Sequence, residues 1–112
     1  MTARTIDREH PAPSADEMAE RAAEAAAFLK ALSHEGRLMI LCHLSSGEKS
    51  VTTLEALIGA RQAAVSQHLA RLRSEGLVAA RRDGKVIFYA IKDPKVRAMV
   101  ALVYEMFCGD KR

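Results

Sequence analysis

The sequence lacks any long hydrophobic run, and this absence excludes a membrane-spanning helix. No apolar stretch approaches the roughly 18 residues needed to cross a bilayer. The first 13 residues mix charges and prolines without an apolar segment, so they do not resemble a secretory signal peptide. We therefore expect a cytoplasmic protein with no membrane partner. Residues 1–13 are expected to form a flexible tail, ahead of one folded domain at residues 14–112.

Cysteine is scarce and the usual catalytic motifs are missing. The chain has two cysteines, which in a reducing compartment are better candidates for chemistry or burial than for a structural disulfide. It has no Gly-rich phosphate loop, no carboxylate pair and no oxyanion-hole loop. Cys42 and His43 are adjacent on a predicted helix, where neighbouring side chains diverge by about 100° and are poorly oriented as nucleophile and base. We expect a protein that is not an enzyme and needs no cofactor.

Basic charge is present and concentrated in one segment. The net charge is +3, but residues 61–85 hold six Lys or Arg against two acidic residues, a local +4, so the remainder sums to −1. Such a segment is typical of a protein that binds a polyanion. The alternative is a solvated basic face, and a pure dimerisation or scaffold protein would not need this charge.

Apolar residues recur at three- and four-residue steps in several segments, which is the pattern of amphipathic helices. Ser14 and Glu17 have the spacing of a capping box, and Ser33 is expected to cap the second helix. Asp93 and Pro94 are a favoured N-cap and first residue for the last helix. The five predicted helices run from Ser14 to residue 32, from Ser33 to residue 44, from 52 or 53 to 58, from 61 or 62 to 74, and from 94 to 108.

The periodicity changes after residue 76. Residues 77–82 and 86–91 are strand candidates, and Asp83-Gly84 between them is a favoured hairpin turn because glycine tolerates positive φ. A short helix, a turn at Gly59, a second helix and a basic hairpin follow one another. This order predicts a winged helix-turn-helix, mainly α with a two-stranded β-wing.

The second helix of such a motif enters the major groove of DNA. Gln can bond adenine with two hydrogen bonds, Arg can bond guanine, and small side chains approach a thymine methyl or a phosphate. Cations on a narrow hairpin suit phosphates or the minor groove. The partner is therefore predicted to be double-stranded operator DNA, contacted by Arg61, Gln62, Ala63, Ser66, Gln67, His68, Arg71, Arg81, Arg82 and Lys85.

Three segments together carry a resemblance to a known family. Residues 31–41 (ALSHEGRLMIL), residues 63–72 (AAVSQHLARL) with the following EGLV, and the RRDGK hairpin resemble the ArsR/SmtB family of bacterial repressors. The similarity covers about residues 18–108. Gly36 is a departure, because the family commonly has proline there.

The resemblance implies a homodimer formed by the first and last helices, and the residue pattern supports it independently. Both helices carry clean apolar seams with no obvious partner in so small a chain. Two-fold pairing would place the recognition helices about one DNA turn, roughly 34 Å, apart. The seams consist of Met18, Ala22, Ala25, Leu29, Val96, Val100, Val103 and Phe107.

Metal sensing is the best-known task of this family, and it is the alternative function here. Family metal sites use a Cys-x-Cys around the third helix or Asp, His and Glu pairs on the last helix. Residues 51–58 have no cysteine and residues 94–107 have no histidine, while the four histidines are scattered. We therefore predict no metal site.

The two cysteines resemble those of the persulfide- and redox-responsive branch of the family, the BigR- and SqrR-like repressors. That branch has one cysteine on the second helix and one at the end of the last helix. The resemblance implies that Cys42 and Cys108 form a sensing dithiol, bridged within one subunit by sulfane sulfur or as a disulfide. Its inducer would be a persulfide or another reactive sulfur species. Two buried cysteines acting as small hydrophobic residues are the alternative.

Overall fold

The computed structural model describes residues 12–59 and 62–109, with the backbone alone at residues 62 and 63. The chain divides into two compact units, residues 1–30 and residues 31–112, and each is described by itself. Most of the predicted tail lies outside the described residues. No helix in the described part of the chain is long and apolar enough to span a membrane.

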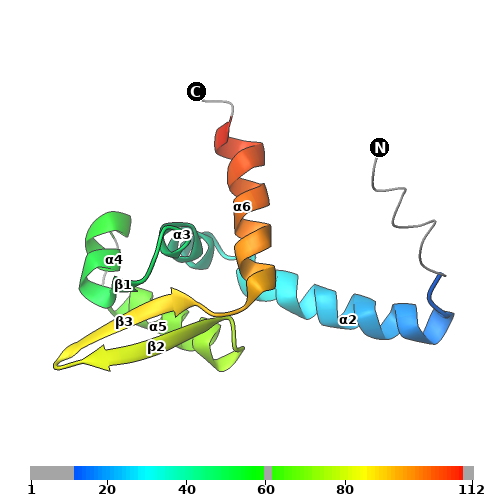
Figure 1. Ribbon diagram of the computed structural model, residues 1–112, viewed down its shortest axis with the longest axis horizontal. Coiled ribbons are helices and arrows are strands. Elements are labelled where there is room, and N and C mark those ends of the chain that lie inside the picture. Colours follow the sequence, from blue (N-terminus) through cyan, green and yellow to red (C-terminus); the bar gives the residue numbers. More distant parts are fainter. Residues whose placement is uncertain (1–11, 60–61, 110–112) are drawn as a thin grey trace. The chain divides into compact units, whose positions relative to one another are not determined.

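The first unit consists of most of helix α2 (Ala15–Leu32) (Figure 1). Its start is the predicted capping box. The Ser14 backbone N–H donates to Glu17 Oε1 (3.0 Å), and the Glu17 N–H donates to Ser14 Oγ (3.1 Å). From Ala15 to Lys30 only Phe28 is half-buried and the rest are exposed. The seam that includes Met18 and Leu29 is therefore uncovered within this unit.

The second unit is built on helices α3 (Glu35–Leu44), α4 (Val51–Ile58) and α5 (Gln62–Ser74). These three helices pack against one another, and α6 (Pro94–Cys108) packs against α3. The apolar stripe of α5 faces inward as Val65, Leu69 and Leu72, whereas α4 buries Leu54 and leaves Leu57 47% exposed. The buried core includes Ile40, Leu41, Leu44, Leu54, Val65, Leu69, Leu72, Val96 and Val100.

Two helix starts differ from the prediction. Helix α3 is capped by His34 rather than Ser33, because the Nδ1 atom of His34 accepts a hydrogen bond from the Gly36 N–H (3.0 Å). Helix α4 begins at Val51, before the predicted Thr52 or Thr53, because Ser50 Oγ accepts from the Thr53 N–H (3.1 Å). In both cases the side chain satisfies a backbone donor that the helix itself leaves unpaired.

The β-sheet has three strands where two were predicted, in the order β1 (Lys49–Ser50), β3 (Val86–Ile91), β2 (Val78–Asp83). All pairs are antiparallel. Asp83 pairs with Val86, so the hairpin turn is Gly84-Lys85 rather than the predicted Asp83-Gly84. Gly84 has φ +65°, as the first residue of a tight hairpin turn often does.

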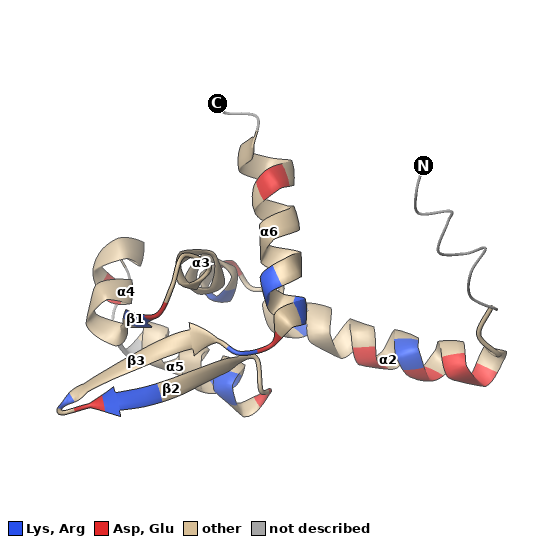
Figure 2. Ribbon diagram, in the orientation of Figure 1, with Lys and Arg blue, Asp and Glu red and all other residues tan. Residues whose placement is uncertain are grey.

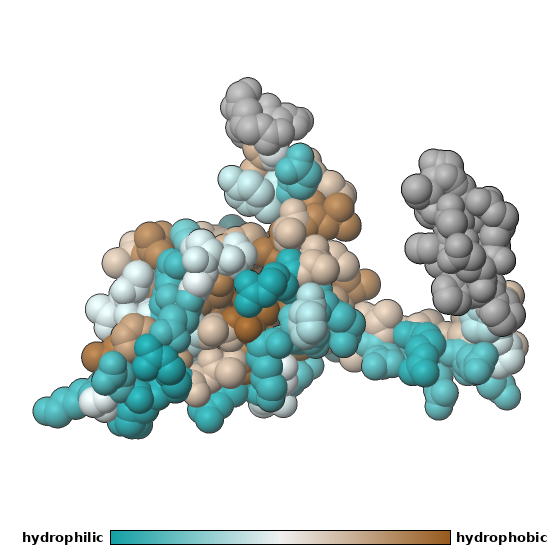
Figure 3. All heavy atoms as spheres, in the orientation of Figure 1, coloured by the Kyte–Doolittle hydropathy of each residue, from teal (hydrophilic) through white to brown (hydrophobic). Residues whose placement is uncertain are grey.

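Helix α6 begins as predicted, with Asp93 Oδ1 accepting from the Lys95 N–H (2.8 Å) and Pro94 in the first turn. Val96 and Val100 are buried inside this single unit, at 0% and 1% exposure. The outer face of the helix remains uncovered and apolar, and Figure 3 shows brown surface along it. Leu102 and Met106, four residues apart, are exposed on the helix, and so are Tyr104 and Phe107, which line a cavity between this helix and α3.

Candidate functional site

Helix α5 has one buried and one exposed face. Val65, Leu69 and Leu72 are at most 1% exposed and anchor the helix to α3 and α4. Ser66 and Gln67 are exposed on the other side, as predicted for residues that reach a DNA groove. Arg61 lies outside the described residues, and Gln62 and Ala63 are described by their backbone only.

His68 lies on α5 but contacts α3. Its ring lies 4.5 Å, centroid to centroid, from the ring of His34, at an interplanar angle of 49°. Partial burial lowers the pKa of His68, and the nearby positive charges of His34 and Arg37 lower it further. The His68 side chain therefore packs against His34 at the start of α3, whereas the sequence predicted that it contacts DNA.

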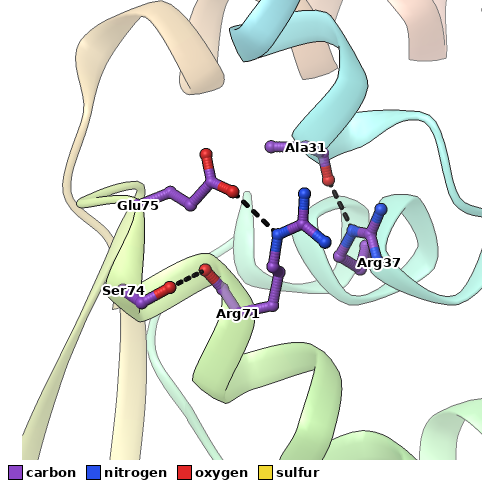
Figure 4. A network of polar contacts seen from close by, with 5 residues as sticks. All are labelled: Ala31, Arg37, Arg71, Ser74 and Glu75. Carbon is purple, nitrogen blue, oxygen red and sulfur yellow. Dashed lines mark hydrogen bonds and ion pairs between the residues drawn. The ribbon is translucent and has the colours of Figure 1, made fainter.

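Arg71 has a partner directly after the end of its own helix. Its Nε donates to Glu75 Oε2 at 2.7 Å, while Ser74 Oγ donates to the Arg71 carbonyl oxygen at 2.9 Å (Figure 4). Nearby, Arg37 Nε donates to the carbonyl oxygen of Ala31 at 2.5 Å. Arg71 therefore closes the C-terminal turn of α5, away from the first turns that enter a groove.

The two arginines of the wing have different surroundings. Arg81 forms a forked ion pair with Glu48, with Nε–Oε2 2.9 Å and Nη2–Oε1 2.5 Å. This hydrogen bond lowers the pKa of the Glu48 carboxyl and raises the pKa of Arg81. Arg82 and Lys85 are exposed and make no ion pair with any residue that the structure describes. Figure 2 shows these cations along β2 and at the hairpin tip.

The structure brings the recognition helix and the wing together at two hollows. Ser66 and Lys85 line a cavity of about 260 Å³ with Thr52 and Tyr89. Arg73 and Arg82 line another of about 190 Å³. Thr52, Arg73 and Tyr89 were not among the predicted contacts. Only Arg73 had a signal in the sequence, because it belongs to the basic segment.

A third cavity lies between α3 and α6, and it is apolar. Cys42 is half-buried and Cys108 is exposed, and both line a space of about 380 Å³. Burial raises the pKa of the Cys42 thiol, and the nearby Cys108 raises it further. Lys111 and Arg112, the cations that follow Cys108 in the sequence, lie outside the described residues. The other lining residues are Leu38, Met39, His43, Val103, Tyr104 and Phe107.

Comparison with known proteins gives consistent matches. Residues 34–80 match the family described as "Bacterial regulatory protein, arsR family". The transcriptional activator HlyU of Vibrio cholerae is 41% identical over 92 residues, which are 82% of this chain and 85% of that protein. The chain belongs to the ArsR family. The biofilm growth-associated repressor of Agrobacterium fabrum is 44% identical over 92 residues, 82% of this chain and 79% of that protein.

Solved structures agree with this assignment. The transcriptional repressor BigR from Xylella fastidiosa superposes with a TM-score of 0.78 at 44% identity, covering 86% of this chain and 98% of that chain. Reduced HlyU from Vibrio cholerae gives 0.80 at 41% identity, covering 82% and 97%. The predicted winged helix-turn-helix fold and the resemblance to the BigR-like branch are confirmed. These relatives are transcriptional regulators, so the prediction that this ArsR-family chain is not an enzyme is also confirmed.

The match spans α3, β1, α4, α5 and the start of β2, and this is the part of the ArsR-family fold that carries the helix-turn-helix. Outside the matched residues, the predicted dimer seam on α6 is buried in one part and exposed in another. Val96 and Val100 are core residues of the single chain and are not available to a second copy. Val103 is half-buried, and Phe107 is 73% exposed. In the described residues no group of three or more His, Cys, Asp or Glu side chains could hold a metal ion.

Proposed function

We propose that this ArsR-family regulator acts in the cytoplasm as a homodimeric repressor that binds operator DNA and is released from it by dithiol chemistry at Cys42 and Cys108. The observation that carries the sensing part is that both thiols line one apolar cavity, although they are 66 positions apart in the sequence. The DNA-binding part is supported by the exposed face of α5 beside a basic wing.

The DNA contacts are proposed to combine groove reading with phosphate binding. Ser66 and Gln67 on α5 reach base edges, and Arg82 and Lys85 on the wing bind phosphates. Gln67→Ala should weaken specific binding by about 1–3 kcal/mol if its contact is bidentate, and should leave non-specific binding nearly intact. Arg82→Ala should weaken both and flatten the salt dependence. If both variants bind the operator as tightly as the wild-type protein at several salt concentrations, the groove assignment is wrong.

The dimer is proposed to use the exposed seam of α2 and the outer face of α6. Exposed apolar helix faces of this kind on a small domain are typical of a protein–protein interface. Met106→Glu should give a folded monomer by light scattering, because Met106 is 59% exposed and does not line the α3–α6 cavity, so the change costs the single chain little, while a carboxylate in an interface is costly to bury. A dimeric Met106→Glu protein would place the interface elsewhere.

The cysteines are proposed to react in a fixed order. Cys108 is exposed, so its thiolate attacks the sulfane sulfur of a persulfide RSSH, releases RSH and becomes the persulfide Cys108–S–SH. Cys42 then attacks the Cys108 sulfur and releases H₂S, which leaves a disulfide. The sum is two thiols plus RSSH giving the disulfide, RSH and H₂S. The raised pKa of Cys42 fits its role as the second nucleophile, because the thiol form attacks slowly.

A bridge across the α3–α6 cavity would change how these two helices pack. Operator affinity then falls if the bridged and reduced forms differ in their fit to DNA by a coupling free energy of about 1–3 kcal/mol.

Cys42→Ser and Cys108→Ser test this proposal directly. Each variant should bind DNA like the reduced wild type, because neither residue lies on α5 or the wing. Each should stay bound when a persulfide donor releases the wild type, and a reductant should restore wild-type binding. Intact-mass measurement after donor or peroxide treatment identifies the bridge. The dithiol proposal would be replaced by metal sensing if the donor released Cys108→Ser from DNA, or if zinc bound stoichiometrically and altered the affinity for DNA.

A further inference from the structure

The Glu48–Arg81 ion pair spans the whole sheet. Glu48 directly precedes β1 and Arg81 lies on β2, while β3 runs between these two edge strands. The two residues are 33 positions apart in sequence, and the guanidinium holds both carboxylate oxygens. An ion pair of this kind joins elements that backbone hydrogen bonds alone do not join.

Phe88 on the central strand supports the crossing. It pairs with Arg81 on one side and with Ser50 on the other. The Cζ atom of Arg81 lies 4.7 Å from the centroid of the Phe88 ring, within the range of a cation–π contact. The arginine side chain therefore crosses the ring of β3 to reach the carboxylate before β1. Its position is determined by two partners at once.

Strand β1 connects this arrangement to the helix-turn-helix. It is two residues long, and its last residue, Ser50, is the N-cap of α4. So short a strand holds few ladder hydrogen bonds and needs further contacts to stay in place. The ion pair supplies such a contact where the wing meets the start of the first helix of the motif.

We propose that Glu48 and Arg81 form a clasp that positions the wing relative to the helix-turn-helix, and that Arg81 is a positioning residue rather than a phosphate ligand. The inference rests on the proposed DNA interface. Arg82 lies next to Arg81 in β2, and neighbouring strand residues point to opposite faces of a sheet. Arg82 and Lys85 then provide the wing's phosphate contacts, while the charge of Arg81 is matched by Glu48.

Arg81→Ala and Arg82→Ala are a matched pair, because each removes one positive charge from adjacent positions. Affinity is measured at 50–200 mM salt for a duplex selected by the wild-type protein from a random pool. A lost phosphate contact makes the slope of log affinity against log salt concentration shallower by about 0.9. Between 50 and 200 mM salt, the affinity of Arg82→Ala should therefore fall by a factor that is about 3.5 times smaller than the factor for the wild-type protein. Arg81→Ala should weaken binding by a constant factor at every salt concentration and keep the wild-type slope.

Charge reversal distinguishes a clasp from a DNA contact. Arg81→Glu and Glu48→Arg should each weaken binding to the selected duplex, since like charges then face each other across β3. The double variant restores an ion pair and should recover wild-type affinity. A phosphate ligand at position 81 cannot be replaced in this way, so failure of the double variant to recover would overturn the clasp.

Hydrogen exchange in the absence of DNA provides an independent measurement. Arg81→Ala and the conservative Glu48→Gln should speed amide exchange at residues 49–50, and Arg82→Ala should leave it unchanged. Unchanged exchange in the first two, or a reduced salt slope in Arg81→Ala, would refute the proposal. If the wild-type protein selected no duplex, the proposed function would fail, while the exchange rates would still decide whether the clasp exists.

Discussion

The start of α3 offers a sharp test of how a small residue is used. Gly36 lies in the first turn of α3, next to the ring of His68. A Cβ atom placed on Gly36 would lie 2.7 Å from Nε2 and 3.0 Å from Cδ2 of that ring. Atoms in contact normally keep about 3.4 Å, so the ring would have to move by about 0.7 Å. We predict that Gly36→Ala destabilises the wild-type protein.

Two opposing effects set the magnitude. Alanine in place of glycine stabilises a helix by up to about 1 kcal/mol. Overpacking costs about 1–3 kcal/mol when the neighbour cannot move freely. The His68 ring is held against His34, which in turn caps α3 through the Gly36 N–H, so the ring has little freedom. The net result should be a loss of about 1 kcal/mol in the free energy of unfolding.

A double-mutant cycle separates the two effects. In a His68→Ala background the overlap disappears, and Gly36→Ala should stabilise by about 0.5–1 kcal/mol. The four proteins are compared by urea unfolding with the slope checked for constancy. His34→Asn is a useful further background, because asparagine is a good N-cap without the ring that holds His68. The same sign of effect in the wild-type and the His68→Ala backgrounds would refute the steric argument.

Three further predictions follow from single residues. The folded state lowers the pKa of His68 below its usual 6.5, so the unfolded chain binds more protons. The free energy of unfolding should therefore be highest above pH 6.5 and fall on acidification. His68→Gln should flatten this dependence in urea titrations between pH 5.5 and 7.5, and an unchanged slope would assign it to another group. Leu69→Ala, at a site with 0% exposure, should cost about 2–5 kcal/mol, and a loss below 1 kcal/mol by the same assay would contradict its core position. Ser50→Ala should cost about 1 kcal/mol by removing the α4 cap, with Ser50→Asp close to wild type, and equal losses in both would show that the cap is unimportant.

Elements with strong local signals were predictable from the sequence. The helices follow from apolar periodicity, and the capping box at Ser14 and the start of α6 at Asp93 follow from local hydrogen-bonding chemistry. Strand β1 was not predictable, because two residues show no alternation and Lys49 pairs with Tyr89, which is 40 positions away. The cap of α3 was misassigned because serine is a common N-cap and histidine is not.

The candidate site was predictable by segment but not by residue. Counting charge locates the basic region, yet it treats every arginine alike. Arg71 and Arg81 have carboxylate partners at different distances along the chain, Glu75 four residues away and Glu48 33 away. The three-dimensional structure shows that Arg71 and Arg81 have these carboxylate partners, whereas Arg82 has none among the described residues. The placement of both cysteines on one cavity likewise depends on how α3 packs against α6, which no local pattern encodes.

The strict pairing of β2 with β3 restricts how the wing can change length during evolution. Arg81 and Arg82 occupy opposite faces only because Arg81 pairs with Phe88 and Arg82 with Ile87. One residue inserted into β2 between Val78 and Arg81 would either exchange the faces of the two arginines or force a bulge. Insertions at Gly84-Lys85 leave the register below the turn intact. We expect related wings to vary in length at the tip and to keep a constant number of residues at the base.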